Sequence, residues 1–175
     1  MEPRLKTLGP EDVTDRARAI FDAFLRERGN IPNMFRTLAH VPPLLETAFA
    51  HFRAVMAPGA VTPRLKEMVA LRVSYRNRCD YCLGSHTKLA AKLGVSQAQM
   101  EAIQRGDFSE FDEGDRAALT LADETYADGH GLSDRTSELV RRHFGDAGLV
   151  ELVAVVGLFH YFNRFNNALR MEVTK

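Results

Sequence analysis

The spacing of apolar residues between glycines and prolines constrains the fold of this chain more than any other feature. Apolar side chains recur every three or four residues in nearly every segment, and almost none of the sequence shows the period-two alternation of strands. Pro10, Pro42 and Pro63 each stand where a helix would begin, while Gly29 and Gly94 stand where one would end. The pattern therefore predicts an all-α fold.

The C-terminal part of the chain follows the same pattern and carries its most apolar segment. Ser133 is expected to cap a helix that ends near Gly145, and a separate last helix should run from about Gly148 to Leu169. Residues 149–156 are apolar nearly all round this last helix. Such a helix is typical of deep burial or of a subunit interface.

Length and charge limit the kind of protein that this can be. The chain has 175 residues, of which 45% are hydrophobic, and this suits a single all-helical domain over residues 1–175. Because 23 basic residues balance 23 acidic ones, no overall field attracts nucleic acid or an anionic membrane. No apolar run approaches the roughly 20 residues of a membrane-spanning helix, and the first residues lack the apolar stretch of a secretory signal. We therefore expect a cytoplasmic protein.

A weak internal duplication accompanies the helical pattern. Residues 67–71 resemble residues 151–155, eighty-four positions later, and the same offset sets Cys82 against Asn166. Duplication of a helical unit, with chemistry kept only in the first copy, would account for this similarity. Asn166 and its neighbour Asn163 fit a site, and they fit hydrogen bonds at a helix end or an interface equally well.

The only two cysteines, Cys79 and Cys82, form a Cys-x-x-Cys pair at the expected start of a helix. Asn77 and Arg78 interrupt the helical pattern just before this pair, so the new helix should begin near Asp80. Two thiols at this spacing can cycle between dithiol and disulfide without a cofactor. In a reducing compartment such a pair is more often catalytic, redox-sensing or metal-binding than a structural disulfide.

Two further residues make residues 61–94 the segment that carries the site motif. His86 follows Cys82 by four residues, so both side chains share one helix face and the imidazole can take the thiol proton. Glu67, on the preceding helix, can fold back to orient or charge His86. A thiol, a base and an orienting carboxylate together form the arrangement that activates a nucleophile.

Which of the two cysteines attacks follows less directly from the sequence. A helix N-terminus would stabilise a thiolate at Cys79, whereas His86 offers Cys82 a specific proton acceptor one turn away. We prefer Cys82 as the thiolate that meets the oxidant, with Cys79 resolving the resulting sulfenic acid to a disulfide. Tyr81 would donate a hydrogen bond or form part of the pocket wall.

A zinc site is the plainer alternative for these residues. Cys79, Cys82 and His86 would supply three ligands, and a fourth would have to come from a distant histidine. The candidates are His51, His130, His143 and His160. Structural zinc sites usually have four ligands at recognisable spacings, and the chain has no second Cys-x-x-Cys, so we expect no metal.

At the glutamate, the two cysteines and the histidine of this motif, the sequence resembles the alkyl hydroperoxidase D and carboxymuconolactone decarboxylase family. The signature of that family has these residue types at these spacings. The sequence is most similar to the branch called peroxidase-related proteins, because Ile31–Arg36 and Phe162–Asn167 also match its pattern. The resemblance covers nearly the whole chain, and it implies an all-helical fold, trimers or hexamers, and thiol-based reduction of hydroperoxides.

The resemblance also implies roles for the motif residues. Cys82 would attack the peroxide, Cys79 would resolve the intermediate, and Glu67 with His86 would relay the proton. The founding members of the family have histidine where this chain has Tyr81. The sequence thus predicts an enzyme that reduces organic hydroperoxides, with an external dithiol or thiol protein as reductant. A general thiol–disulfide oxidoreductase and a redox-sensing oligomer without enzymatic activity are the alternatives.

Overall fold

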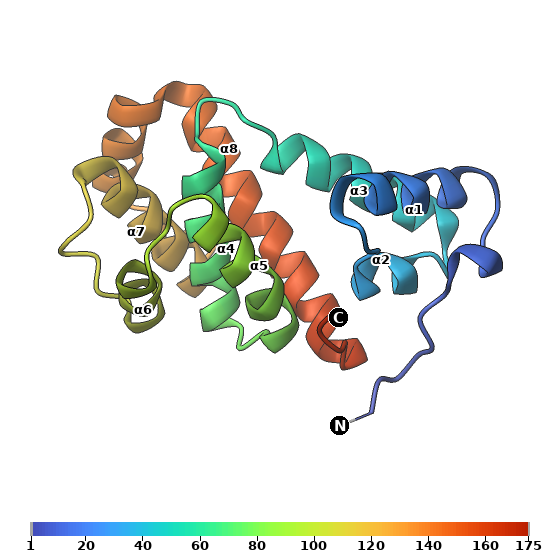
Figure 1. Cartoon of the computed structure of the whole chain (residues 1–175). Coiled ribbons are helices and arrows are strands. Elements are labelled where there is room, and N and C mark those ends of the chain that lie inside the picture. The colour runs from blue at the N-terminus through green and yellow to red at the C-terminus, as the bar shows by residue number, and fades with distance from the viewer. Residues whose placement is uncertain (1, 175) are drawn as a thin grey trace.

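The computed structural model describes residues 2–174, and within this range it contains eight α-helices and no strand (Figure 1). A short 3₁₀ helix, Pro10–Asp12, precedes them. The helices are α1 (Asp15–Arg28), α2 (Asn33–Leu38), α3 (Pro42–Met56), α4 (Pro63–Arg76), α5 (Asp80–Lys92), α6 (Gln97–Arg105), α7 (Glu113–Ala127) and α8 (Asp134–Leu169). The predicted all-α fold is confirmed.

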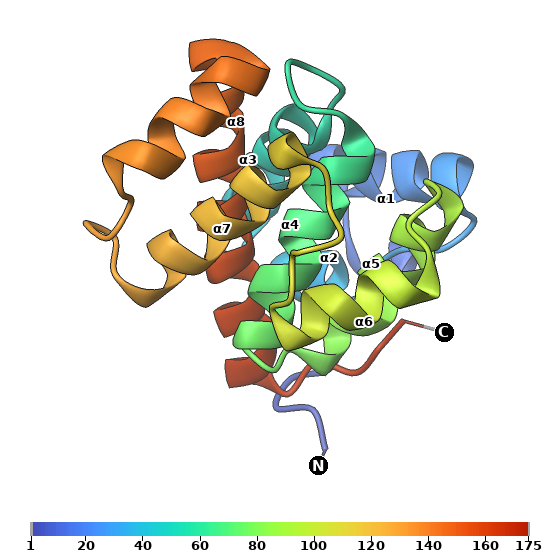
Figure 2. The same cartoon turned by 90° about the vertical axis from the view of Figure 1, so that its left-hand side faces the viewer.

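The helices are arranged around α4 and the long helix α8. Helices α1 to α3 gather on one side of α8, and α6 and α7 gather on the other, while both termini lie near one end of the molecule (Figure 1). A second view shows α4 in the centre, enclosed by the later helices (Figure 2). Consistent with this, α4 packs against α5, α6, α7 and α8.

Helix α4 is buried on all its sides, at every position from Leu65 to Ser74. Its sequence carries charged residues among the apolar ones, and a buried charge needs a partner. Lys66, whose side chain is 1% exposed, lies 2.8 Å from Glu151 of α8, and Arg72 binds Asp123 of α7 through two bonds of 2.7 and 2.8 Å. These ion pairs fix α4 rotationally between α7 and α8.

Helix α8 contains one break, at Gly145. Its φ of 68° and ψ of −175° lie in a region that is essentially restricted to glycine. The sequence predicted a helix ending near this glycine and another beginning at about Gly148. The break is at the predicted place, but it takes a single residue, and the helix resumes directly after it.

The apolar segment of α8 differs from two of our expectations. By length and composition α8 is apolar enough to cross a membrane, although we expected no run of this kind. It packs against α3, α4, α5 and α7, and these contacts account for an apolar core helix. Only a third of its most apolar window is buried, however, and Val150 is 69% exposed. Deep burial therefore applies to Leu152, Val155 and Val156 and is wrong for the face that carries Val150 and Val153.

The two segments related by the internal similarity meet in space but differ in form. Residues 67–82 span the break between α4 and α5, whereas residues 151–166 belong to one uninterrupted stretch of α8. Helix α8 packs directly against both α4 and α5. An ancestral duplication stays a prediction, and the structure adds that the two segments face each other.

Candidate active site

The turn between α4 and α5 positions both cysteines. Arg78 adopts a left-handed conformation with a φ of 52°, and the backbone N–H of Cys79 then donates to the Ser74 carbonyl at 3.0 Å. Helix α5 begins at Asp80, as the sequence predicted, with Cys79 as its N-cap residue. The Cys79 sulfur accepts a hydrogen bond from the backbone N–H of Cys82 at 3.4 Å. This cap turns both sulfurs inward.

The two sulfurs lie beside each other in the interior. Cys79 Sγ and Cys82 Sγ are 2.7 Å apart, and both residues are free cysteines. Cys79 is 0% exposed and Cys82 is 3% exposed. A disulfide between them requires little movement of the chain, because the Cβ atoms of a Cys-x-x-Cys turn are already close.

Glu67 and His86 come together as the sequence suggested. His86 Nδ1 lies 2.6 Å from Glu67 Oε2, and both side chains are largely buried. The ring of Phe159 packs edge-on against the imidazole, with centroids 4.7 Å apart. Because Glu67 holds Nδ1, the other ring nitrogen, Nε2, is the one available to exchange a proton. The imidazole thus has one fixed tautomer and one fixed orientation.

Helix α8 supplies contacts that the sequence left undecided. Asn166 donates from Nδ2 to Cys82 Sγ at 3.3 Å. Asn163 donates to Ser74 Oγ at 3.2 Å and accepts from Asn77 Nδ2 at 2.9 Å. These two asparagines brace the turn that carries the cysteines. In the sequence, an offset of eighty-four residues sets Cys82 against Asn166, but it does not predict that the two side chains are in contact.

The surroundings separate the acidities of the two thiols. The Cys79 thiol donates a hydrogen bond that lowers the pKa of Cys82 to about 7, even though burial opposes the charge. The amide of Asn166 and the charge of His86 act in the same direction. The same hydrogen bond, together with burial, raises the pKa of Cys79 far above its usual range. Cys82 is therefore the more acidic of the two thiols.

Burial and neighbouring charges act in opposite directions on the pKa of His86. Burial opposes its positive charge, but the charge and hydrogen bond of Glu67 prevail, so the pKa of His86 is raised. A thiolate at Cys82 raises this pKa further, whereas the cation of Arg28 lowers it. No hydrogen bond joins His86 to Cys82 within residues 2–174, and the two groups interact through charge. His86 can hold a proton close to the reactive sulfur.

A small cavity of about 50 Å³ opens onto Cys82. Its walls combine aromatic and aliphatic side chains with a few polar groups, and they come from α1, α2, α3, α5 and α8. The lining includes Arg28, Met34, Phe35, Phe52, Tyr81, Cys82, His86, Leu89, Phe159, Phe162 and Asn166. A buried water needs about 10–15 Å³, so the space admits a few atoms of a substrate beside the sulfur.

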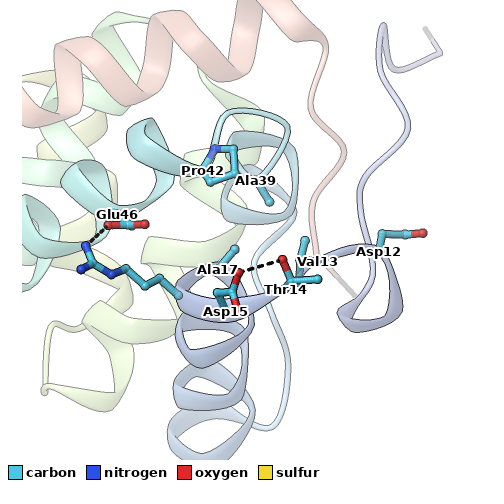
Figure 3. Close-up of a pocket in the computed structure, with 9 residues that line it drawn as sticks. Asp12, Val13, Thr14, Asp15, Ala17, Ala39, Pro42 and Glu46 are labelled. Carbon is cyan, nitrogen blue, oxygen red and sulfur yellow. Dashed lines mark hydrogen bonds and ion pairs between the residues drawn. The ribbon is translucent and has the colours of Figure 1, made fainter.

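A larger hollow of about 460 Å³ lies elsewhere, between the start of α1 and the start of α3 (Figure 3). Carboxylates gather along it, including Asp12 and Glu46, and Arg16 pairs with Glu46 at 3.1 Å. Its lining contains no cysteine and no histidine. The reactive groups belong to the smaller cavity.

Tyr81 lines the cavity, but its hydroxyl is already engaged. The oxygen accepts a hydrogen bond from the backbone N–H of Met34 at 3.0 Å and lies 3.4 Å from Thr174 Oγ1. Burial raises the pKa of Tyr81, so it stays a neutral phenol. Its position favours the wall role over a role in proton transfer.

The histidines considered as distant zinc ligands are engaged elsewhere or exposed. His143 pairs with Glu113 at 3.0 Å, and His160 stacks on Tyr126 with ring centroids 5.0 Å apart. In the part of the chain that the structure describes, no group of three His, Cys, Asp or Glu side chains is placed to hold a metal ion.

Comparison with known proteins agrees with this fold. The sequence model of the carboxymuconolactone decarboxylase family matches residues 42–124, which include both cysteines, His86 and Glu67. The uncharacterized protein YdfG of Bacillus subtilis is 26% identical over 106 residues, covering 59% of this chain and 72% of that protein. The similarity is therefore centred on the segment that carries the site.

Solved structures are similar over almost the whole chain. A peroxidase-related protein of Ralstonia eutropha with an alkylhydroperoxidase AhpD core has a TM-score of 0.89 at 24% identity, covering 99% of this chain and 93% of that one. The debrominase Bmp8 has a TM-score of 0.80 at 22% identity, covering 96% and 90%. The fold is thus that of the alkylhydroperoxidase D-like helical proteins. Residues 42–124 of the chain thus match the carboxymuconolactone decarboxylase family, and the whole chain shares its fold with solved peroxidase-related proteins.

Proposed function

We propose that the protein is a thiol-dependent peroxidase that reduces organic hydroperoxides through a dithiol–disulfide cycle of Cys79 and Cys82. The observation that carries the proposal is the acidified sulfur of Cys82 at a small cavity, 2.7 Å from a second thiol. The histidine–glutamate pair beside it adds a proton store. Peroxide reduction needs these elements and no metal or organic cofactor.

The first step forms a sulfur–oxygen bond and breaks the peroxide bond. The Cys82 thiolate attacks the terminal oxygen of the hydroperoxide and becomes a sulfenic acid. The alkoxide that leaves takes a proton, and the raised pKa of His86 makes its imidazolium a suitable donor. Glu67 stabilises the imidazolium before the transfer and keeps the neutral ring in place afterwards.

The second step forms the disulfide. The Cys79 sulfur attacks Cys82 Sγ, its thiol proton goes to the departing hydroxyl, and water is released. The raised pKa of Cys79 keeps it protonated until this stage, so it does not compete for the peroxide. An external dithiol then reduces the pair and is itself oxidised to a disulfide. One turnover converts a hydroperoxide and a dithiol into an alcohol, water and a disulfide.

Reaction with cumene hydroperoxide tests this cycle. Reduced protein should lose both thiols, form an intramolecular disulfide and release the alcohol in equal amounts. Cys82→Ser should abolish peroxide consumption, whereas Cys79→Ser should react once and stop at a sulfenic acid that dimedone traps. If peroxide and thiols both stayed unchanged in the parent protein, the proposal would be wrong.

Burial weighs against a general thiol–disulfide oxidoreductase. A disulfide of another protein would have to reach Cys82 through a cavity of about 50 Å³, and Cys79 has no exposed surface. A small hydroperoxide group fits such access better than a folded partner does. Parallel rates with cumene hydroperoxide and a protein disulfide distinguish the two functions, and a faster reaction with the protein disulfide would favour the alternative.

Reductive dehalogenation is a second candidate, because aromatic rings line the cavity and the debrominase Bmp8 has the same fold. A variant of that enzyme has been solved with 2,3,4-tribromopyrrole. In this reaction the Cys82 thiolate would take the bromine, the ring carbon would gain a proton, and Cys79 would displace bromide as the disulfide forms. Bromide release from tribromopyrrole by reduced protein would support it, and its absence alongside peroxide turnover would exclude it.

A further inference from the structure

Asn166 carries the one buried side-chain oxygen or nitrogen that lacks a hydrogen-bond partner among residues 2–174. The atom is Oδ1, and the residue is 1% exposed. Asn166 also lines the cavity at Cys82. Native proteins pair nearly all buried polar atoms, so an unpaired acceptor at the edge of a reactive cavity requires an explanation.

The contacts of the amide group fix which of its two ends is unpaired. Nδ2 donates to Cys82 Sγ at 3.3 Å and to Met34 Sδ at 3.5 Å. A thioether sulfur has no hydrogen to give, and neither has a thiolate. Rotating the amide would therefore place its oxygen against two acceptors, so Oδ1 stays turned away from both sulfurs.

Neighbouring donors do not satisfy this oxygen. The Tyr81 hydroxyl lies against Met34 N–H and Thr174, and His86 gives its Nδ1 to Glu67. The amide of Asn163 is used by Ser74. Asn166 in the cavity wall thus carries an acceptor on the same amide whose Nδ2 contacts the Cys82 sulfur, and no donor of the described chain meets it.

We propose that Asn166 Oδ1 accepts a hydrogen bond from the O–H of the substrate, so that the cavity selects hydroperoxides over electrophiles without a donor. This inference rests on the proposed peroxidase function. The oxygen that carries the hydrogen in a hydroperoxide is the terminal one, and it is the atom that Cys82 attacks. One amide would then hold the sulfur through Nδ2 and the incoming oxygen through Oδ1.

The contact persists through the chemical step. The bond from Cys82 Sγ to the terminal oxygen forms as the oxygen–oxygen bond breaks, and the alkoxide leaves with a proton from His86. The hydrogen on the terminal oxygen stays in place and becomes that of the sulfenic acid. Its hydrogen bond to Oδ1 is therefore available before, during and after the attack, which makes Asn166 a catalytic residue in this scheme.

Two electrophiles separate this role from an effect on the Cys82 pKa. Methyl methanethiosulfonate has no N–H or O–H group, whereas cumene hydroperoxide has the donor. Rates with both reagents, measured across pH, give the pKa of Cys82 and the limiting rate constant of its thiolate. In Asn166→Leu the pKa should rise, and the limiting rate with the hydroperoxide should fall about tenfold, the usual effect of one lost hydrogen bond. The limiting rate with the thiosulfonate should stay within about twofold.

Further variants complete the test: one keeps an acceptor oxygen at position 166, and another is a control at an exposed position. Asn166→Asp keeps an acceptor oxygen, so its ratio of hydroperoxide to thiosulfonate limiting rates should stay near that of the parent. Ala168→Ser, at an exposed position of α8, serves as the control and should change neither rate. Should Asn166→Leu fail to fold, Asn166→Ala provides the same comparison.

The outcomes distinguish the two proposals. Equal losses with both reagents in Asn166→Leu would show that Asn166 acts through Cys82 alone, and this inference would be overturned while the peroxidase stood. A parent protein that reacts with the thiosulfonate and leaves the hydroperoxide untouched would overturn the proposed function itself.

Discussion

Cys79 and Cys82 carry the same functional group, and their surroundings give them opposite acidities. Cys82 gains hydrogen bonds from Cys79 and Asn166 and the field of His86, which together lower its pKa to about 7. Cys79 donates one of these hydrogen bonds and is deeply buried, and both effects raise its pKa. At the scale of single residues, the sulfur that receives hydrogen-bond donors is the more acidic one, and in the proposed cycle it attacks first.

The pH dependence of peroxide attack follows from these shifts. The Cys82 thiolate is the reactive form, so the rate should rise with pH through about 7, and it should fall again at higher pH, where His86 loses its proton. Cys79→Ala removes the thiol donor, which is the largest stabilising contact, and should move this rise to higher pH. Stopped-flow alkylation of Cys82 as a function of pH measures both curves. An unshifted curve in Cys79→Ala would contradict the assigned cause.

Glu67→Gln tests the proton store. Removing the carboxylate takes away the charge and the hydrogen bond that raise the pKa of His86, so burial should then prevail and this pKa should fall. The imidazolium donates the proton, so the loss of rate at high pH should begin at a lower pH than in the parent protein. Proton NMR titration of the His86 ring checks the pKa directly, and an unchanged value would exclude the role of Glu67.

At the scale of elements, the break in α8 is a glycine-dependent feature. Gly145→Ala should destabilise the protein by about 1–3 kcal/mol, because alanine does not tolerate the φ of 68° with an extended ψ. Gly157→Ala is the matched control: Gly157 lies on an exposed face of the same helix, and an added Cβ meets nothing within 4 Å. That variant should gain about 0.5–1 kcal/mol. Urea unfolding measures both, and equal effects would contradict the prediction.

At the scale of the whole molecule, α8 has one face in the core and one in solvent. Leu152, Val155 and Phe159 lie inside, while Val150 and Val153 are exposed. Exposed apolar side chains in a row are typical of protein interfaces. This face therefore supports the prediction of a homo-oligomer, in which further copies cover it.

The assembly prediction has a direct test. The chain has a mass of 19.6 kDa, and light scattering should give a multiple of this value. The double change Val150→Glu and Val153→Glu should lower the mass toward that of a monomer, because charges would replace the exposed apolar surface. Leu25→Glu, at an exposed apolar position of α1, is the control and should leave the mass unchanged. A monomeric parent protein would show the prediction to be wrong.

Much of the site could be predicted because it is local in sequence. Cys79, Cys82 and His86 lie within one turn-and-helix segment, where spacing fixes which side chains share a face. The proximity of Glu67 to His86 could be predicted in the same way, because a single short turn separates its helix, α4, from α5. Local geometry carries such predictions even when the rest of the fold is unknown.

The contact of Asn166 with Cys82 could not be predicted from the sequence. Asn166 lies eighty-four residues from Cys82, and a single sequence does not say that two distant helices cross at these positions. Lys66 and Arg72 show the same limit, since a charged residue in the sequence gives no sign of burial, and the structure buries every position from Leu65 to Ser74. Burial on all sides depends on how several helices pack together.

The sequence alone determined the helical architecture, the Cys-x-x-Cys pair and the histidine one helical turn after it, because helix periodicity and residue spacing act over a few residues. The tertiary structure decided which thiol has the lower pKa, how small the cavity at Cys82 is, and which amide donates a hydrogen bond to the Cys82 sulfur. Those properties arise from burial and from contacts between α4, α5 and α8, and they exist only once distant segments have excluded water around Cys82.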